Sequence, residues 1–192
     1  VLANIYMHNV LTLWFQYIIA KECKGECFLV VYADDFIAGF QYPWEAERFY
    51  EQLRSRMAKF GLELEENKSR IVESGRYLAS LKAKRGESTR LGTFDFLGFT
   101  FYCGRTTKGN PWIMPKTSSK KFRQKVKEIK IWLYNNKEQK LGKLMYMLNV
   151  KLVGHYRYYG ISFNSRMISN YKQQVRELLY KVLNRRSEKK SY

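Results

Sequence analysis

The sequence predicts an α+β protein, in which an antiparallel sheet with two packing helices is followed by three further helices. Before residue 103, short β-branched and aromatic runs alternate with helical periodicity, whereas after residue 117 only helical periodicity remains. A segment containing glycine and proline separates the two patterns. We therefore predict a first domain over residues 1–103, a linker over 104–116 and a helical domain over 117–192.

The first domain opens with a predicted helix and a predicted hairpin. Apolar residues recur at helical spacing from Val1 to about Ala20, which predicts an amphipathic helix lying on a sheet. Residues 28–32 and 36–40 have the composition of strands and flank two acidic residues, which predicts a hairpin with the acids in its turn. A second helix is predicted from Pro43 to Gly61, because proline suits the first helical turn and glycine ends helices.

The remaining elements follow from shorter patterns. Strands are predicted at residues 62–64, 69–72 and 94–101, where apolar and aromatic residues gather, and residues 82–90 are predicted to form a polar loop. The helical domain has three apolar stripes at helical spacing. They run from Phe122 to Leu133, from Leu141 to Leu152 and from Ile168 to Val182.

The charge of the chain is concentrated in its second half. The formal net charge is +18, but residues 1–100 hold 13 basic and 13 acidic residues, whereas residues 101–192 hold 22 basic and 4 acidic residues. Such a surplus favours a polyanionic partner, nucleic acid or an acidic membrane surface, and the interleaved aromatic residues favour nucleic acid. No apolar run reaches the roughly 20 residues that would span a bilayer, so we expect no membrane segment.

The three cysteines, Cys23, Cys27 and Cys103, do not suggest a disulfide scaffold. Their number is odd and no secretory leader opens the chain, so reduced thiols are expected. Cys23 and Cys27 could bind zinc together with His8 or His155, but the spacing lacks a second pair of ligands. Packing or hydrogen bonding is the simpler role for both histidines.

Asp34 and Asp35 are two of the three aspartates in the chain, and apolar runs flank them on both sides. Adjacent carboxylates beside a buried run repel each other and lose solvation, so they need a cation, hydrogen bonds or exposure. A divalent metal site is one explanation, and a solvated hairpin turn is the other, because aspartate is common in turns. For a metal site we expect Mg²⁺, or Mn²⁺ in its place, because it prefers hard oxygen ligands.

Several blocks, in the right order, resemble the reverse transcriptase/maturase proteins of group II introns. Tyr32-Ala33-Asp34-Asp35 resembles the family's catalytic turn, and Phe96-Leu97-Gly98-Phe99 resembles the hairpin that grips the primer end. Three further blocks resemble the helix before that turn, the palm motif after it and the thumb or X domain: Leu2 to Tyr6, Gly61 to Val72 and Leu148 to Gly160. The family usually has an aromatic residue where this chain has His155.

The resemblance implies an RNA-directed DNA polymerase with an incomplete palm over residues 1–103 and a thumb/X domain over 117–192. It implies that Asp34 and Asp35 bind Mg²⁺ and that Lys68 assists catalysis by donating a proton to pyrophosphate or contacting phosphate. The implied nucleic-acid-binding residues are Tyr32, Ala33, Leu97, Gly98, Lys120, Lys121, Arg123, Arg157 and Tyr158. The implied partners are an RNA template, a DNA primer, deoxynucleotides and group II intron RNA, whose splicing the protein would assist.

Other functions fit part of this pattern. They are an RNA-binding or splicing-assistance fragment without polymerase activity, a retron or CRISPR-associated reverse transcriptase, and a basic structural protein of a ribonucleoprotein. The family's fingers and its upstream metal-binding aspartate would precede Val1, and Asp95 does not match that aspartate. We therefore expect an N-terminally truncated chain with little polymerase activity of its own, located in the bacterial cytoplasm with the nucleoid or a ribonucleoprotein.

Overall fold

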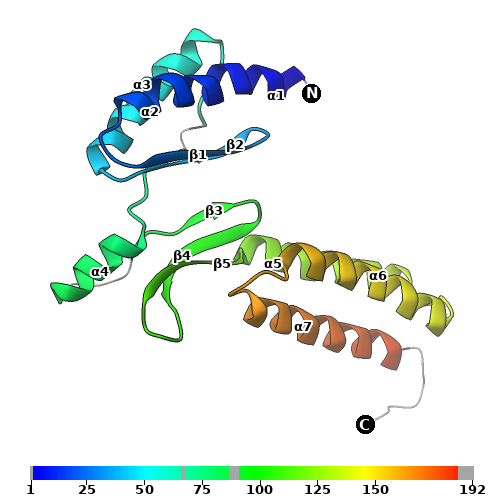
Figure 1. Cartoon of the computed structure of the whole chain (residues 1–192). Coiled ribbons are helices and arrows are strands. Elements are labelled where there is room, and N and C mark those ends of the chain that lie inside the picture. The colour runs from blue at the N-terminus through cyan, green and yellow to red at the C-terminus, as the bar shows by residue number, and fades with distance from the viewer. Residues whose placement is uncertain (1, 66–67, 87–90, 186–192) are drawn as a thin grey trace. The chain divides into compact units, whose positions relative to one another are not determined.

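The computed structural model describes residues 2–65, 68–86 and 91–185, in two compact units, Val1–Glu73 and Ser74–Tyr192 (Figure 1). Each unit combines helices with one antiparallel sheet, which confirms the predicted α+β class. Among the described residues, no helix combines the length and the apolar character that crossing a membrane requires.

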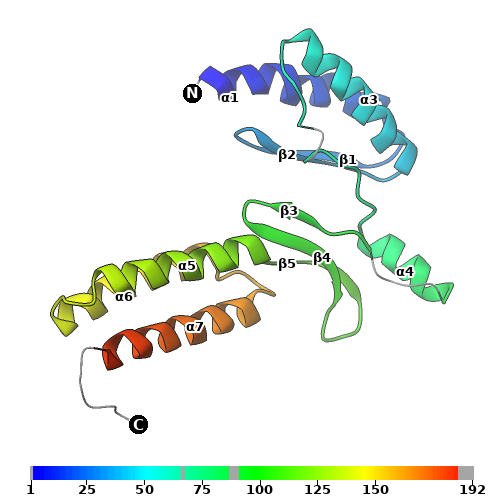
Figure 2. The ribbon, with the colours of Figure 1, turned by 180° about the vertical axis from the view of Figure 1, so that it is seen from behind.

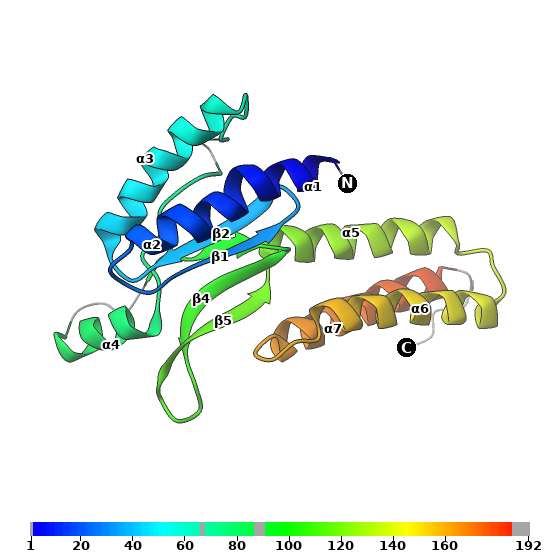
Figure 3. The same cartoon turned by 45° about the horizontal axis from the view of Figure 1, so that its top comes forward.

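The first unit consists of a long helix, a two-stranded hairpin and a second helix. The long helix comprises α1 (Leu2–Met7), two π-helical segments, η1 (His8–Thr12) and η2 (Phe15–Ile19), and α2 (Ala20–Glu22). Strands β1 (Cys27–Tyr32) and β2 (Asp35–Phe40) pair in antiparallel fashion, and α3 spans Pro43–Lys59 with proline in its first turn. Figure 3 shows the long helix and α3 on the same side of the hairpin. These bounds confirm the predicted helices and hairpin.

The core of the first unit lies between the two helices and one face of the hairpin. Phe49 is central to it, because the rings of Trp14, Phe15 and Phe40 lie 5.7, 5.6 and 5.1 Å from the Phe49 ring. The other buried core residues are Val10, Leu11, Ile19, Leu53 and Met57. Burial alternates along β1, so Phe28, Val30 and Tyr32 on the opposite face are exposed.

The second unit begins with α4 (Arg76–Lys84) and a sheet in the order β3-β4-β5. The strands are β3 (Phe94–Phe96), β4 (Phe99–Arg105) and β5 (Pro111–Thr117). Three helices follow, α5 (Ser119–Asn135), α6 (Leu141–Tyr159) and α7 (Ser165–Asn184), and they lie side by side in Figures 1 and 2.

The apolar stripes of these three helices meet in a second core, as the sequence predicts. Its buried residues are Ile129, Leu133, Leu144, Leu148, Tyr171, Val175 and Val182. The His155 ring stacks on the Tyr171 ring with 3.7 Å between centroids and an angle of 17°. Here His155 fills the space of an aromatic ring, the residue type that the resemblance implies for this position.

Three strand predictions were wrong. Residues 62–64 and 69–72 form no strand in the described part of the chain; Leu62 and Leu64 pack against the first core without pairing to a neighbour. The predicted strand over 94–101 is two strands, because the chain reverses at Leu97 and Gly98. Both residues have positive φ, 50° and 80°, which is the backbone of a tight two-residue hairpin turn.

Two predicted irregular segments are also ordered. Residues 76–84 form α4, although a loop was predicted from residue 82; residues 87–90 of that loop lie outside the described residues. Residues 104–116, the predicted linker, contain the end of β4, a turn and most of β5. Pro111 and Pro115 are tolerated there because β5 is an edge strand, where a missing N–H costs little. The domain boundary assigned to this segment stays a prediction.

Candidate functional site

The two acidic residues lie at the turn of the β1–β2 hairpin. Tyr32 pairs with Asp35, so Ala33 and Asp34 form a two-residue connection and Asp35 begins β2. Ala33 has φ 55°, a left-handed value that glycine usually provides in such turns. Both carboxylates are exposed, so the strand pairing brings Asp34 and Asp35 to one accessible end of the hairpin.

The carboxylates of this turn are available to a cation. Among the described residues, neither carboxylate makes a hydrogen bond or an ion pair. The same residues contain no group of three or more potential metal ligands. Two accessible carboxylates fit part of a Mg²⁺ shell, because Mg²⁺ is often held by one or two carboxylates together with substrate phosphates and water. Asp34 and Asp35 could therefore hold the ion, with the remaining ligands supplied from elsewhere.

Lys68 is close enough to the turn to interact electrostatically with it. The Lys68 ammonium lies 2.5 Å from a Glu65 carboxylate oxygen, and the Lys68 side chain is 76% exposed. The hydrogen bond and charge of Glu65 raise the pKa of Lys68, and the charges of Asp35 and Asp34 act in the same direction. Lys68 therefore keeps its proton at neutral pH, which a proton donor or a phosphate contact requires.

The cysteine pair does not resemble a zinc site. Burial, followed by a side-chain hydrogen bond to Cys27, raises the pKa of Cys23 to about 11. Such a pKa disfavours the thiolate, which is the form that binds zinc. Among the described residues, the pair belongs to no group of three or more side chains that could hold a metal ion.

The turn that resembles a primer grip is held by the helical bundle. The Tyr158 hydroxyl donates a hydrogen bond to the Leu97 carbonyl at 2.9 Å, and the Ser118 backbone N–H donates one to the Gly98 carbonyl at 2.9 Å. The Tyr158 ring also stacks on the Phe99 ring, 5.8 Å away. Tyr158, predicted to contact nucleic acid, is thus in contact with the turn, while half of its surface stays exposed.

Asn164 is a residue of this site that sequence reasoning missed. It is fully buried. Its side-chain oxygen accepts a hydrogen bond from the Thr117 N–H at 2.8 Å. Its side-chain nitrogen donates to the Thr117 hydroxyl at 2.8 Å and to the Tyr159 carbonyl at 2.7 Å. It therefore fixes the end of β5 against the end of α6. Its place just before the third apolar stripe, at a helix start, was the available signal.

The predicted basic contacts lie on exposed positions of α5 and α6. Lys120, Lys121 and Arg123 follow Ser118, whose side chain caps α5 by accepting a hydrogen bond from the Lys121 N–H at 3.3 Å. The Lys121 side chain comes 3.5 Å from where a side chain on Gly98 would start, so it lies beside the Leu97–Gly98 turn. Arg157 is exposed in the last turn of α6.

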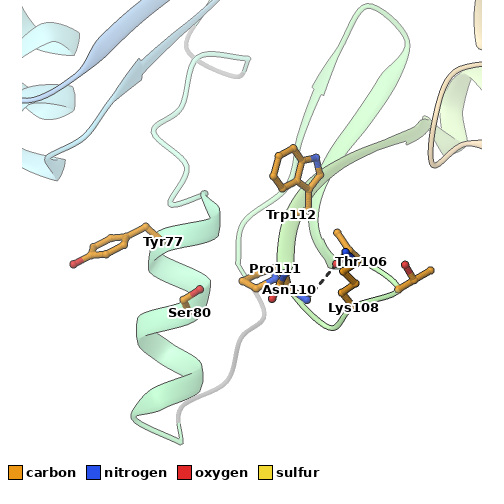
Figure 4. Close-up of a pocket in the computed structure, with 8 residues that line it drawn as sticks. Tyr77, Ser80, Thr106, Lys108, Asn110, Pro111 and Trp112 are labelled. Atoms are coloured by element: carbon orange, nitrogen blue, oxygen red, sulfur yellow. Dashed lines mark hydrogen bonds between the residues drawn. The ribbon is translucent and has the colours of Figure 1, made fainter.

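A pocket that the sequence did not predict lies between α4 and the tip of the β4–β5 hairpin (Figure 4). Tyr77 and Trp112 are exposed aromatic residues in its lining. Both were within segments predicted as irregular or left unassigned, so their place in one pocket lining depends on the unpredicted α4 and β5. The high aromatic content of the chain was the only signal available.

Two family models match the chain. Residues 1–101 match reverse transcriptase (RNA-dependent DNA polymerase), and residues 119–192 match the group II intron maturase-specific domain. Searches of curated proteins and of solved structures gave no match. The first model covers more than half of the chain and includes both turns described above, and the two domains imply nucleic-acid partners such as intron RNA. The chain belongs to the group II intron reverse transcriptase/maturase family.

Proposed function

We propose that the protein serves RNA-directed DNA synthesis, with Asp34 and Asp35 as carboxylate ligands of Mg²⁺. The observation that supports this most is the accessible end of the β1–β2 hairpin, where both carboxylates lie without a competing hydrogen bond or ion pair in the described residues. Mg²⁺ bound there would stabilise the charge that develops when a primer 3′ hydroxyl attacks the α-phosphorus of a deoxynucleotide and pyrophosphate leaves.

The chain's other predicted site residues have complementary roles in this proposal. Lys68, protonated at neutral pH, donates a proton to the leaving pyrophosphate or contacts phosphate. The Leu97–Gly98 turn positions the primer, with Tyr32 and Ala33 beside the metal ligands. The basic helices, through Lys120, Lys121, Arg123 and Arg157, hold the RNA–DNA duplex and, in the maturase role, group II intron RNA. Such a protein would work in the bacterial cytoplasm, on the nucleoid or in a ribonucleoprotein.

A second function, RNA binding and splicing assistance without polymerase activity, is favoured by one specific observation. The described residues bring two carboxylates together at the turn but no third metal-ligating side chain. The second unit is nevertheless strongly basic, which suits RNA binding independent of nucleotide addition. The same basic helices would then bind intron RNA, and Asp34 would be dispensable.

One experiment separates these functions. The 192-residue chain is titrated with Mn²⁺ while NMR line broadening is followed, and primer extension on an RNA template is assayed with Mg²⁺. The proposal expects broadening centred on residues 32–36 that the variant Asp34→Asn reduces strongly, with Asp95→Asn as the matched control that leaves it unchanged. Extension lost in Asp34→Ala would place the polymerase activity in this chain.

The outcomes have distinct meanings. Broadening spread evenly over all carboxylates would contradict the metal site. Localised broadening without primer extension would retain the metal site and assign the chain to RNA binding. An affinity for intron RNA that Asp34→Ala leaves unchanged would then support that assignment. The same affinity lost in Asp34→Ala would contradict the splicing-assistance alternative.

A further inference from the structure

The pocket between α4 and the β4–β5 hairpin has a volume of about 550 Å³, within the range of about 300–1,000 Å³ that small-molecule pockets occupy. Tyr77 and Ser80 line it from α4, and Thr106, Lys108, Asn110 and Trp112 line it from the hairpin (Figure 4). All of them belong to the second unit. None is among the residues assigned above to metal binding, primer positioning or the basic helices.

Trp112 provides the main aromatic surface of this pocket. It is 42% exposed, its partner across the β4–β5 ladder is Gly104, and the Met114 sulfur lies 2.7 Å from where a side chain on Gly104 would start. Tyr77 is 76% exposed, and in Figure 4 its ring projects from α4 away from the hairpin, at the rim of the pocket. Exposed aromatic rings of this kind are stacking surfaces for unpaired bases.

The hairpin tip holds its polar groups in a fixed arrangement. The Thr106 N–H donates to the Asn110 carbonyl and the Gly109 N–H donates to the Thr106 carbonyl, both at 2.8 Å. The Asn110 N–H in turn donates to the Thr106 hydroxyl at 3.2 Å. The ordered turn therefore presents an amide side chain and a lysine next to the aromatic surface, without a cost for ordering the loop when a ligand binds.

The charge around the pocket selects an anionic ligand. Among the described residues that line it, Lys108 is positively charged and none is acidic. A neutral metabolite or an aromatic peptide would match the rings but would not use this positive charge. A nucleotide within a single strand matches both, because it combines a π-face with a phosphate.

We propose that this pocket binds an unpaired nucleobase of single-stranded RNA. The base stacks on Trp112, the side chains of Asn110 and Thr106 hydrogen-bond to its edge, and Lys108 pairs with the adjacent phosphate. Tyr77 stacks with the neighbouring nucleotide at the rim. The proposal rests on the proposed function in one respect, since the ligand is the RNA on which the protein acts.

The test measures binding of the 192-residue chain to a short oligoadenylate and to an abasic sugar–phosphate strand of equal length. Trp112→Ala should weaken oligoadenylate binding about fivefold or more, because stacking on one aromatic residue contributes that much or more per base, and should leave the abasic strand unaffected. Trp112→Phe, which keeps a ring, should retain most of the affinity. Trp44→Ala is the matched control, because Trp44 is 44% exposed but lies in the first unit.

Two further variants separate stacking from charge. Tyr77→Ala should weaken oligoadenylate binding while Tyr77→Phe should not. Lys108→Ala should reduce the slope of log K against log salt by about 0.7, as expected for one phosphate contact to a single strand. Lys137→Ala, in the turn between α5 and α6, is the control and should leave this slope unchanged. Thermal melts of each variant verify that the second unit stays folded.

The outcomes distinguish this proposal from the proposed function. RNA binding that is insensitive to both Trp112→Ala and Tyr77→Ala would overturn the pocket and leave the proposed function intact. Equal losses on oligoadenylate and on the abasic strand would also overturn it, because the site would then bind phosphate alone. No binding of RNA by the unaltered chain would overturn both.

Discussion

The two compact units differ in charge, although each contains a hairpin turn that we propose takes part in nucleotide addition. Residues 1–73 have 8 basic and 11 acidic residues, a net charge of −3, whereas residues 74–192 have 27 basic and 6 acidic residues, a net charge of +21. The unit with the Asp34–Asp35 turn is therefore slightly acidic, and nearly all attraction for a polyanion resides in the other. The difference in net charge between these two units is larger than the difference between residues 1–100 and 101–192.

The two turns also differ in how firmly neighbouring residues hold them. Around Asp34 the side chains are exposed and, within the described residues, no hydrogen bond or ion pair restrains the carboxylates. The Leu97–Gly98 turn receives hydrogen bonds from Tyr158 and Ser118. A turn that must accept a cation needs open oxygen atoms, whereas a turn that positions a strand end needs rigidity, so the contrast matches the roles we propose.

The largest effects are expected from truncating one core at a time. Leu53→Ala and Leu133→Ala, at 2% and 0% exposure, should each lower the free energy of unfolding of their own unit by about 2–5 kcal/mol. Urea unfolding followed through the indole NMR signals of Trp44 and Trp132 reports each unit separately. Ile131→Ala, at 50% exposure on α5, is the control with little effect. Equal shifts of both indole signals in either variant would show one cooperative unit and break the comparison.

The next effect tests how the second unit braces its turn. Asn164→Ala should lower the free energy of unfolding of this unit by about 2–4 kcal/mol, because the buried Thr117 and Tyr159 groups lose their partner. Asn149→Ala, an exposed asparagine on α6, is the matched control. Hydrogen exchange at the Ser118 amide should accelerate in Asn164→Ala. Unchanged exchange would mean that Asn164 does not support the turn.

Long periodic elements and the hairpin with Asp34 and Asp35 at its turn could be predicted from sequence, whereas features that depend on remote partners could not. The stripes of α5, α6 and α7 and the runs flanking Asp34 follow from local period and composition. Glu45 shows the limit: it was predictable in the first turn of a helix, but not as a buried side chain that accepts hydrogen bonds from the N–H groups of Lys24 and Gly25, at 2.6 and 3.2 Å.

The same limit explains the site residues that were missed. Asn164 and Trp112 acquire their roles from Thr117 and α4, which are distant in sequence, and no local pattern encodes those contacts. For Leu97 and Gly98 the family resemblance implied a hairpin, which the structure has, whereas the apolar pattern alone predicted a continuous strand. The positive φ of Leu97 is imposed by the reversal of the chain, so its residue type gave no turn signal.

A smaller effect separates the units by pH. Burial, followed by the charge of Lys125, lowers the pKa of His155 from 6.5 to about 4, and the rings of Tyr156, Tyr159 and Tyr171 surround it. The unfolded chain then binds more protons than the folded one between about pH 6.5 and about pH 4, so stability falls as pH decreases through this window. The loss between about pH 7 and about pH 5 should be on the order of 1–2 kcal/mol and confined to the second unit.

His155→Phe provides the control for this pH dependence. It restores the aromatic residue that the family usually has and removes the titrating group, so the second unit should lose most of its pH dependence over this window. Urea unfolding at several pH values, followed through the Trp132 signal, measures the difference. A second unit that keeps its pH dependence in His155→Phe would assign the effect to other groups.

The smallest effect concerns the rigidity of the Leu97–Gly98 turn itself. Gly98 and Gly109 both have φ 80°, so alanine at either position adopts a left-handed backbone at a cost of about 1 kcal/mol. Only at Gly98 would the new methyl group meet another part of the unit, because the Tyr159 hydroxyl lies 2.9 Å away, whereas no atom lies within 4 Å at Gly109. Gly98→Ala should therefore destabilise the second unit by about 1 kcal/mol more than Gly109→Ala does.

Urea unfolding of the two variants measures this difference directly, and Gly98→Ala combined with Tyr159→Phe should remove most of it. Equal destabilisation by the two single variants would mean that the bundle does not constrain this turn, and that the contrast with the open Asp34 turn is one of backbone conformation alone.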